Sequence, residues 1–255
     1  MLVAGVDAGS RAVKLVLWDR AEGRSLAAGM LDQGVQQDAL ANDLLERLLA
    51  EAGCSRDDLR GVVATGYGRN IVSFADRTIT EITCHAHGVR HVMPEARTII
   101  DIGGQDCKVI HLDDRGNVYD FSMNDRCAAG SGRFLEMVAS RLDVSLNHLA
   151  ELSNRSASPA AISSMCVVFA ETEIVGLLAT GTPSEDIVAG VLQSLARRVA
   201  GMMGRVKDGP VVFTGGAAQI SGLVDALEEA LERPVIVAPE PQMTGALGAA
   251  LNALQ

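Results

Sequence analysis

Aromatic residues, cysteines and positive charge are all scarce in this chain, and each shortage excludes a class of function. Phe, Trp and Tyr make up 3% of the 255 residues, too few for the stacking platforms that bind single-stranded nucleic acid. The formal net charge of −10 argues against a basic nucleic-acid-binding surface. No apolar run reaches the roughly 18 residues of a membrane span, and the N-terminus lacks a signal-peptide pattern. We therefore expect a cytoplasmic protein without nucleic-acid or membrane partners.

The cysteines are too few and too scattered for a disulfide framework. They are Cys54, Cys84, Cys107, Cys127 and Cys166. An odd number in a reducing setting leaves three interpretations open: inert core thiols, reactive thiols or metal ligands. Hydrophobic residues, at 48%, are numerous enough for one large domain or two lobes, so wholesale disorder is excluded.

An internal repeat is the strongest pattern in the sequence. Residues 6–16 match residues 100–110, with Asp, Gly and Lys at identical spacing. Each copy predicts a strand, a Gly turn and a second strand, and a third strand candidate follows at 24–31 and at 117–123. The repeat predicts two lobes built on the same plan.

Strands and helices alternate along the rest of the chain, which is the α/β pattern. Apolar periodicity and capping residues predict helices at 39–52, 81–92, 132–142, 167–178, 184–206, 217–231 and 243–254, and strands at 61–65, 210–214 and 234–238. We expect a first lobe over residues 1–95 and a second over 96–242. The final helix, about 243–255, is expected to pack back on the first lobe.

The two Gly turns are candidate phosphate-binding loops. Backbone N–H groups at Gly9, and at Gly103 and Gly104 in the second copy, can approach a phosphate, and Ser10 and Lys14 add donors. One copy alone is more simply an ordinary hairpin turn with a surface lysine. Two copies that face each other across a cleft would clamp a polyphosphate from both sides.

Acidic and amide side chains in the repeat are candidates for hydrolysis. Asp7 and Asp101 stand two residues before the first Gly of each turn. Pointing inward, they would hold the waters of Mg²⁺ or position the attacking water. Gln105, by its place in the second copy, is a candidate to orient that water.

A third Gly element joins a predicted strand to a helix. The backbone amides of Gly215, Gly216 and Ala217 suit an anion, or let a nucleoside pack flat on the main chain; a plain tight turn is the alternative. The chain contains neither a P-loop nor a Rossmann glycine pattern in the required context. Two phosphate hairpins followed by this turn resemble the actin, sugar kinase and Hsp70 ATPase superfamily, which implies a two-lobed fold with duplicated βββαβα-type halves.

Two cysteines share a setting that the others lack. Cys127 and Cys166 each stand just before a predicted helix, where the helix dipole favours a thiolate or an anionic iron–sulfur cluster. Two small buried thiols are the alternative. A [4Fe–4S] cluster takes four thiolates, so two chains related by a two-fold axis would have to supply two each.

The remaining cysteines are interpreted as structural. Cys84, His85 and His87 lie close together, but no second cysteine pair accompanies them, so a zinc site is not expected. Both histidines are expected on or near a helix surface.

Longer motifs resemble one family within this superfamily. They lie at residues 64–70, 81–86, 101–106, 124–134, 213–216 and 245–251. They are similar to those of the ATP-dependent activators of 2-hydroxyacyl-CoA dehydratases and of the ATPase subunits of benzoyl-CoA reductase, over about residues 2–254. The cysteine-bearing segments make the resemblance specific, because other members of the superfamily lack them.

The resemblance implies an ATPase coupled to one-electron transfer. It implies ATP or ADP with Mg²⁺, and one [4Fe–4S] cluster that Cys127 and Cys166 would hold between two copies of the chain, or between the chain and a paralogue. A ferredoxin or flavodoxin would supply the electron, and an iron–sulfur acyl-CoA dehydratase or reductase would receive it. One departure from the family pattern is Arg11-Ala12-Val13, where many members carry hydroxyl residues. Side-chain alternation along a hairpin favours solvent rather than phosphate for Arg11.

Two other functions fit the same residues. One is a small-molecule kinase of the superfamily with purely structural cysteines; the other is an ATP-binding sensor or assembly module. The partner enzyme, its acyl-CoA substrate and the choice between homodimer and paralogue pair stay open.

Overall fold

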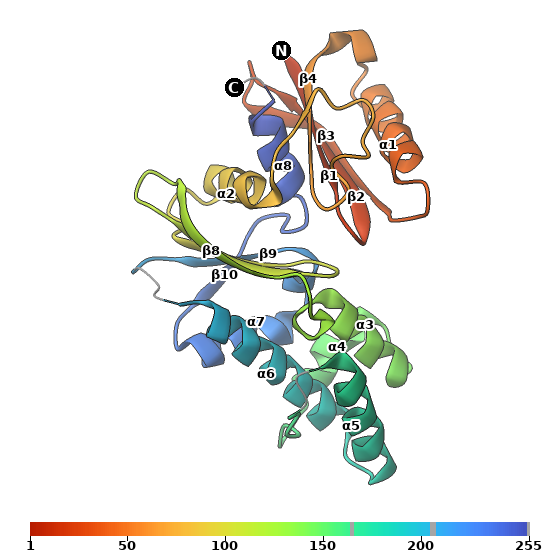
Figure 1. Cartoon of the computed structure of the whole chain (residues 1–255), viewed down its shortest axis with the longest axis vertical. Helices are drawn as coiled ribbons and strands as arrows, with labels where there is room; N and C mark the ends of the chain where they lie inside the picture. The colour runs from red at the N-terminus through yellow and green to blue at the C-terminus, as the bar shows by residue number, and fades with distance from the viewer. Residues whose placement is uncertain (164–165, 205–207, 254–255) are drawn as a thin grey trace.

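Two five-stranded mixed sheets form the framework of the computed structural model, which describes residues 1–163, 166–204 and 208–253 (Figure 1). The first sheet has the order β3 (Arg24–Asp32), β2 (Ala12–Asp19), β1 (Leu2–Ala8), β4 (Leu59–Thr65), β5 (Arg77–Thr78). The second has the order β10 (Val235–Val237), β9 (Val211–Thr214), β6 (Thr98–Ile102), β7 (Cys107–Leu112), β8 (Val118–Asn124). We call each sheet, with the helices packed on its outer face, a lobe.

The repeat in the sequence is a repeat in space. β1 is antiparallel to β2 and parallel to β4, and β6 is antiparallel to β7 and parallel to β9. Asp7 lies opposite Lys14 in the first hairpin, and Asp101 lies opposite Lys108 in the second. Directly opposite residues of an antiparallel pair point to the same side, so each lysine can reach its aspartate. The predicted α/β architecture with duplicated halves is confirmed.

The outer helices bury the apolar stripes that their sequences predict. In the first lobe, α1 (Gln37–Glu51) packs leucines 44, 45, 48 and 49 against the sheet. In the second lobe, the outer helices are α3 (Gly132–Arg141), α4 (Leu146–Ser153), α5 (Val167–Ala179), α6 (Ser184–Met202) and α7 (Ser221–Leu231). Phe134 and Val138 of α3 and Leu195 of α6 join Phe213 of β9 in the larger core.

Helices α2 (Glu81–Val92) and α8 (Thr244–Leu251) lie between the two sheets (Figure 1). α8 packs on β1, β2 and β4, while α2 places Ala86 and Val89 against the second sheet. The two helices cross at glycines: a Cβ on Gly248 would lie 1.7 Å from the carbonyl oxygen of Cys84. Their axes can approach this closely only because side chains are missing at the crossing.

Element boundaries agree with the sequence predictions within a few residues, and the differences have local causes. The helix predicted over 217–231 is interrupted: a short 3₁₀ turn, η3 (Gly216–Gln219), precedes α7 because Ile220 takes an extended conformation. The short elements β5 and α4 were not predicted. The ends of the helices predicted over 184–206 and 243–254 fall at residues 205–206 and 254, outside the described residues. Within the described ranges, no helix is both long and apolar enough to cross a membrane.

Candidate active site

A cavity of about 300 Å³ lies between the two lobes and draws its lining from both. Every residue that the sequence predicted for catalysis or nucleotide binding lines it: Asp7, Gly9, Ser10, Lys14, Asp101, Gly103, Gly104, Gln105, Gly215, Gly216 and Ala217. These residues come from the tips of both hairpins and from the turn after β9. The three segments are far apart in sequence, so the fold is what brings them together.

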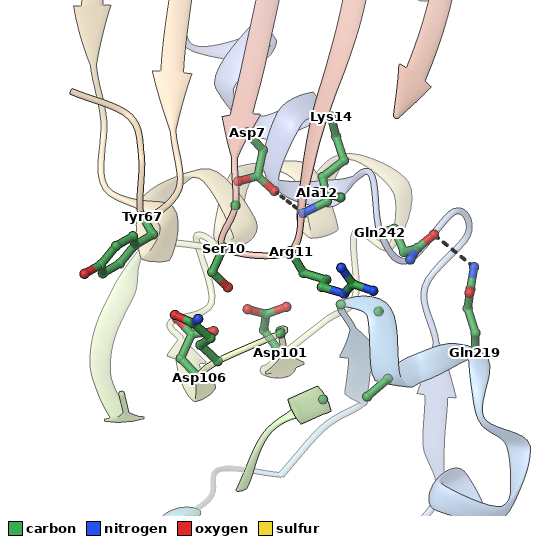
Figure 2. A pocket seen from close by; sticks show the side chains of 18 of the residues that line it. Asp7, Ser10, Arg11, Ala12, Lys14, Tyr67, Asp101, Asp106, Gln219 and Gln242 are labelled. Atoms are coloured by element: carbon green, nitrogen blue, oxygen red, sulfur yellow. Dashed lines mark hydrogen bonds and ion pairs between the residues drawn. The ribbon is translucent and has the colours of Figure 1, made fainter. Parts of the chain in front are cut away.

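The tips of the two hairpins have the same local structure. The N–H of Gly9 donates to the carbonyl of Ala12 at 3.1 Å, and the N–H of Gly103 donates to that of Asp106 at 3.0 Å. Lys14 Nζ lies 3.1 Å from Asp7 Oδ2 (Figure 2). Below the first tip in that view, Ser10 points toward Asp101 and Asp106.

The second hairpin carries a buried ion cluster. Lys108 Nζ lies 3.1 Å from Asp101 Oδ2, 2.7 Å from Asp106 Oδ2 and 3.4 Å from Glu81 Oε2. The Lys108 side chain is only 1% exposed. Lys108, Asp106 and Glu81 were not among the predicted site residues. Lys108 could have been found from the repeat, because it stands seven residues after Asp101, as Lys14 does after Asp7.

Burial and the neighbouring charges act in opposite directions on these groups. Burial lowers the pKa of Lys108, but Asp101, Asp106 and Glu81 outweigh it and hold that pKa far above its ordinary value. Burial raises the pKa of Asp101, but His85 and Lys108 outweigh it, so the net pKa is lowered. Burial dominates at Glu81 and raises its pKa. Asp101 and Asp106 together outnumber the single ammonium of Lys108, so the second tip keeps an excess of negative charge. Among the described residues, no cluster of three or more His, Cys, Asp or Glu side chains is arranged to hold a metal ion by itself.

His85 is buried, so the expectation that it lies on or near a helix surface was wrong. It is 7% exposed, with Nδ1 3.0 Å from Thr244 Oγ1 and Nε2 3.5 Å from Asp101 Oδ2. The reason is that α2 is covered by α8 on one side and by the second sheet on the other. Glu81 and His85 are four residues apart and line the cavity from one face of α2, a spacing that would have identified them.

The turn after β9 brings its main chain against the end of β6. Gly215 has a φ of +88°, and a Cβ there would lie 2.5 Å from the carbonyl oxygen of Ile102. Glycine is required for both reasons. At the rim of the cavity, Gln219 Nε2 donates to Gln242 Oε1 at 3.1 Å (Figure 2). Gly216 and Ala217, at the start of η3, line the cavity without a bulky side chain, whereas the N–H of Gly215 donates to the carbonyl of Pro241 at 2.9 Å.

The two cysteines predicted as cluster ligands are accessible. Cys166 is exposed and caps the N-terminus of α5; Cys127 is partly exposed and precedes the 3₁₀ turn η2 (Ala128–Gly130), which leads into α3. Asn124 holds the Cys127 main chain with two hydrogen bonds of 3.1 Å. Residues 164–165, directly before Cys166, lie outside the described residues.

Cys84 and Cys107 are buried, and burial raises the pKa of both thiols, to about 11 for Cys84 and further for Cys107. They therefore stay protonated in the core. A cluster requires thiolates that a second chain can also approach. Cys127 and Cys166 fit this requirement, and the two buried thiols do not.

Helix α3 begins directly on the second hairpin. The N–H of Gly132 donates to the carbonyl of Gly103, and that of Arg133 to the carbonyl of Gly104, both at 2.9 Å. Only a short segment separates Cys127 from these two residues. Main-chain hydrogen bonds thus fix the start of α3, shortly after Cys127 in the chain, to the hairpin tip that lines the cavity.

The hairpin alternation predicted that the Arg11 side chain faces solvent, and it does so only in part. Its side chain is 55% exposed, but Nε donates to Glu136 Oε1 of α3 at 2.7 Å, and the residue lines the cavity. Glu136 belongs to the other lobe, a partner that the local alternation pattern cannot reveal.

Comparisons with known proteins agree with this geometry. The family model described as the BadF/BadG/BcrA/BcrD ATPase family matches residues 4–253. The activator of lactoyl-CoA dehydratase from Anaerotignum propionicum is 45% identical over 258 residues, covering 100% of this chain and 98% of the relative.

Solved structures show the same fold. The activator of the 2-hydroxyisocaproyl-CoA dehydratase from Clostridium difficile, with bound ADPNP, has a TM-score of 0.92 at 43% identity, covering 99% of this chain and 94% of that one. A ROK family glucokinase from Streptomyces griseus, 15% identical with a TM-score of 0.61 over 99% of both chains, shares the fold alone. The paired hairpins, the cavity between the lobes and the match over nearly the whole length lead to one assignment: the chain belongs to the BadF/BadG/BcrA/BcrD ATPase family.

Proposed function

We propose that this chain is an ATP-hydrolysing electron donor that activates a partner 2-hydroxyacyl-CoA dehydratase. The observation that carries the proposal is the hydrogen-bonded contact between the second hairpin and α3, the helix that follows Cys127. It gives a nucleotide in the cavity a direct mechanical route to the thiol. The relatives named as dehydratase activators favour a dehydratase over a benzoyl-CoA reductase as the partner.

The nucleotide would lie across the cavity with its phosphates at the hairpin tips. The N–H of Gly104, with Ser10 and Lys14, would bind the phosphates, and the turn at Gly215–Ala217 would pack against the nucleoside. Gly9 and Gly103, whose N–H groups donate within their own hairpins, would let the phosphates approach the main chain closely. An ADPNP-bound relative supports ATP and ADP as ligands. With the lobe boundary near residue 95, closure of the two lobes would bring the tips onto the phosphates from both sides.

Hydrolysis would use the buried carboxylates. Asp7 and Asp101 would orient the waters of Mg²⁺, whose charge the carboxylate excess around Lys108 favours. Gln105, beside the second tip, would orient the attacking water. Lys14 and Lys108 would hold the Asp7 and Asp101 carboxylates in place at the cavity through their ion pairs.

Cys127 and Cys166 of one chain, with the same pair of a second chain or a paralogue, would hold one [4Fe–4S] cluster. Such a group supplies low-potential one-electron chemistry when bound. Cys166 caps the N-terminus of α5, whose dipole favours an anionic donor set, while Cys127 precedes the short turn η2 that leads into α3. A ferredoxin or flavodoxin is the proposed electron source.

Anaerobic purification with iron and sulfide analysis, light scattering and an ATPase assay tests the proposal. We expect a brown dimer with about four irons per two chains. Cys127→Ser should lose both iron and dimer, while Cys54→Ser, at a partly buried position away from the cavity lining, should keep both. A colourless monomer that phosphorylates a small molecule would refute electron donation and favour a kinase of the same fold.

A further inference from the structure

Arg11 joins the two lobes at the mouth of the cavity. It follows Ser10 at the first hairpin tip, and its Nε donates to Glu136 Oε1 of α3 at 2.7 Å. Its stem packs on the second tip, since a Cβ on Gly104 would lie 2.7 Å from Arg11 Cβ. Figure 2 shows the side chain extending from the hairpin into the cavity.

Glu136 does not depend on Arg11 alone. Arg133, one turn earlier on α3, places Nη1 3.7 Å from Glu136 Oε2. Loss of the Arg11 contact would therefore leave the carboxylate with a cation beside it and partly in solvent, its side chain being 24% exposed. Movement of the Arg11 guanidinium from Glu136 to another anion would therefore cost little free energy, because neither charge would become buried and unpaired.

We propose that Arg11 distinguishes a nucleoside triphosphate from a diphosphate by exchanging Glu136 for the terminal phosphate. The inference rests on the proposed function, which places the nucleoside at Gly215–Ala217 and the phosphates at the hairpin tips. A guanidinium binds phosphate oxygens in a bidentate manner, and a terminal phosphate carries more negative charge than one carboxylate. A diphosphate is one group shorter and leaves Arg11 on Glu136.

The exchange has a consequence for α3. The helix is fixed from its own lobe by the carbonyls of Gly103 and Gly104, and from the other lobe by Arg11. When Arg11 turns to the phosphate, the first lobe releases the helix that follows Cys127. The triphosphate and diphosphate states then differ in how firmly this helix is held.

Equilibrium binding of ADPNP and ADP to four forms of the full chain tests the exchange: wild type, Arg11→Ala, Glu136→Gln and the double variant. We expect Arg11→Ala to weaken ADPNP about tenfold, as for loss of one charge-assisted phosphate contact, and ADP less than about twofold. Glu136→Gln should tighten ADPNP about threefold when Arg11 is present and have no effect when it is absent. Arg133→Ala is the matched control and should weaken ADPNP less than Arg11→Ala does.

Hydrogen exchange of residues 132–141 is the second readout. ADPNP should speed exchange in the wild type and ADP should not, whereas Arg11→Ala should exchange fast with either nucleotide. Equal weakening of both nucleotides by Arg11→Ala, or an equal effect of Glu136→Gln in both backgrounds, would overturn the inference while ATP binding stands. A wild-type chain that binds neither nucleotide would refute the proposed function itself.

Discussion

Substitution of Lys108 by Met tests how much the buried ion cluster of the second hairpin stabilises the fold. The reference is the less buried Lys14–Asp7 ion pair at the equivalent position of the first hairpin. Lys108 and Lys14 lie at equivalent positions, each 3.1 Å from the aspartate opposite it. The Lys108 side chain is 1% exposed and has three carboxylate partners, while the Lys14 side chain is 17% exposed and has Asp7. Lys14→Met is therefore the control, because it removes the same ammonium group from an ion pair that is less buried.

The expected losses follow from that difference in burial. Removing one partner of a buried ion pair leaves an uncompensated charge and costs about 3–5 kcal/mol of unfolding free energy. Lys108→Met should fall in this range at pH 7, because Asp101 is 4% exposed at its side chain and loses its ammonium. Lys14→Met should cost about 1–2 kcal/mol, since water reaches that pair.

The sign of the pH dependence follows from the lowered pKa of Asp101. A carboxyl group whose pKa is lower in the folded state stabilises the protein above its unfolded pKa of about 3.9, and this contribution is lost as the pH falls. In Lys108→Met the carboxylates are easier to protonate, so the variant recovers part of its deficit on acidification. The gap between the unfolding free energies of wild type and variant should be full above about pH 5 and should narrow as the pH falls below about 4.

Urea unfolding followed by far-ultraviolet circular dichroism at pH 7.5 and at about pH 3.5 measures the effect. Trp18 is the single tryptophan and lies in β2, so its fluorescence reports the first lobe separately. Equal losses of unfolding free energy in Lys108→Met and Lys14→Met would refute the argument that the more buried ion cluster, in the second hairpin, stabilises the fold more. A deficit that is the same at both pH values would refute the electrostatic cause.

Further predictions concern hydrolysis, the thiols and the helix crossing. Asp101→Asn should lower ATP turnover about a hundredfold and change the ADPNP dissociation constant less than about threefold; unchanged turnover would remove it from the mechanism. Cys166→Ser should lose iron and dimer in an anaerobic preparation, and retention of both would exclude it as a ligand. Gly248→Ala should lower the unfolding free energy by about 1–3 kcal/mol, because its Cβ would meet the Cys84 carbonyl. The control Gly176→Ala, in helix α5 with open space around it, should raise it by about 0.5–1 kcal/mol.

The sequence was sufficient for the parts of the site that repeat. Asp7 and Asp101, with their glycines, recur at one spacing, so a pattern seen twice predicted both hairpins and their shared cavity. The sequence also predicted each of Cys127 and Cys166 directly before a helix; Cys166 does cap α5, but Cys127 is separated from α3 by the turn η2 and the cap Ser131. Local sequence patterns predict the conformation of a turn or of a helix start, and the hairpin predictions depended on such local conformations alone.

Contacts between segments far apart in the chain could not be predicted from such local patterns. His85 is buried because α8 returns from the C-terminus and covers α2, and no pattern within residues 81–92 records this packing. Arg11 finds Glu136, 125 residues away, for the same reason. In both cases the side chain's environment is set by tertiary packing, which overrides what strand or helix periodicity alone suggests.

The unequal burial of the two copies also indicates which hairpin moves. The second hairpin has its lysine sealed among three carboxylates and carries the start of α3 on its own carbonyls. The first hairpin has a more exposed lysine and contacts α3 through the half-exposed side chain of Arg11. Opening is easiest where buried contacts are fewest. The second hairpin and α3 should therefore behave as one rigid unit, while the first tip is free to approach or leave the phosphates and to carry Arg11 with it.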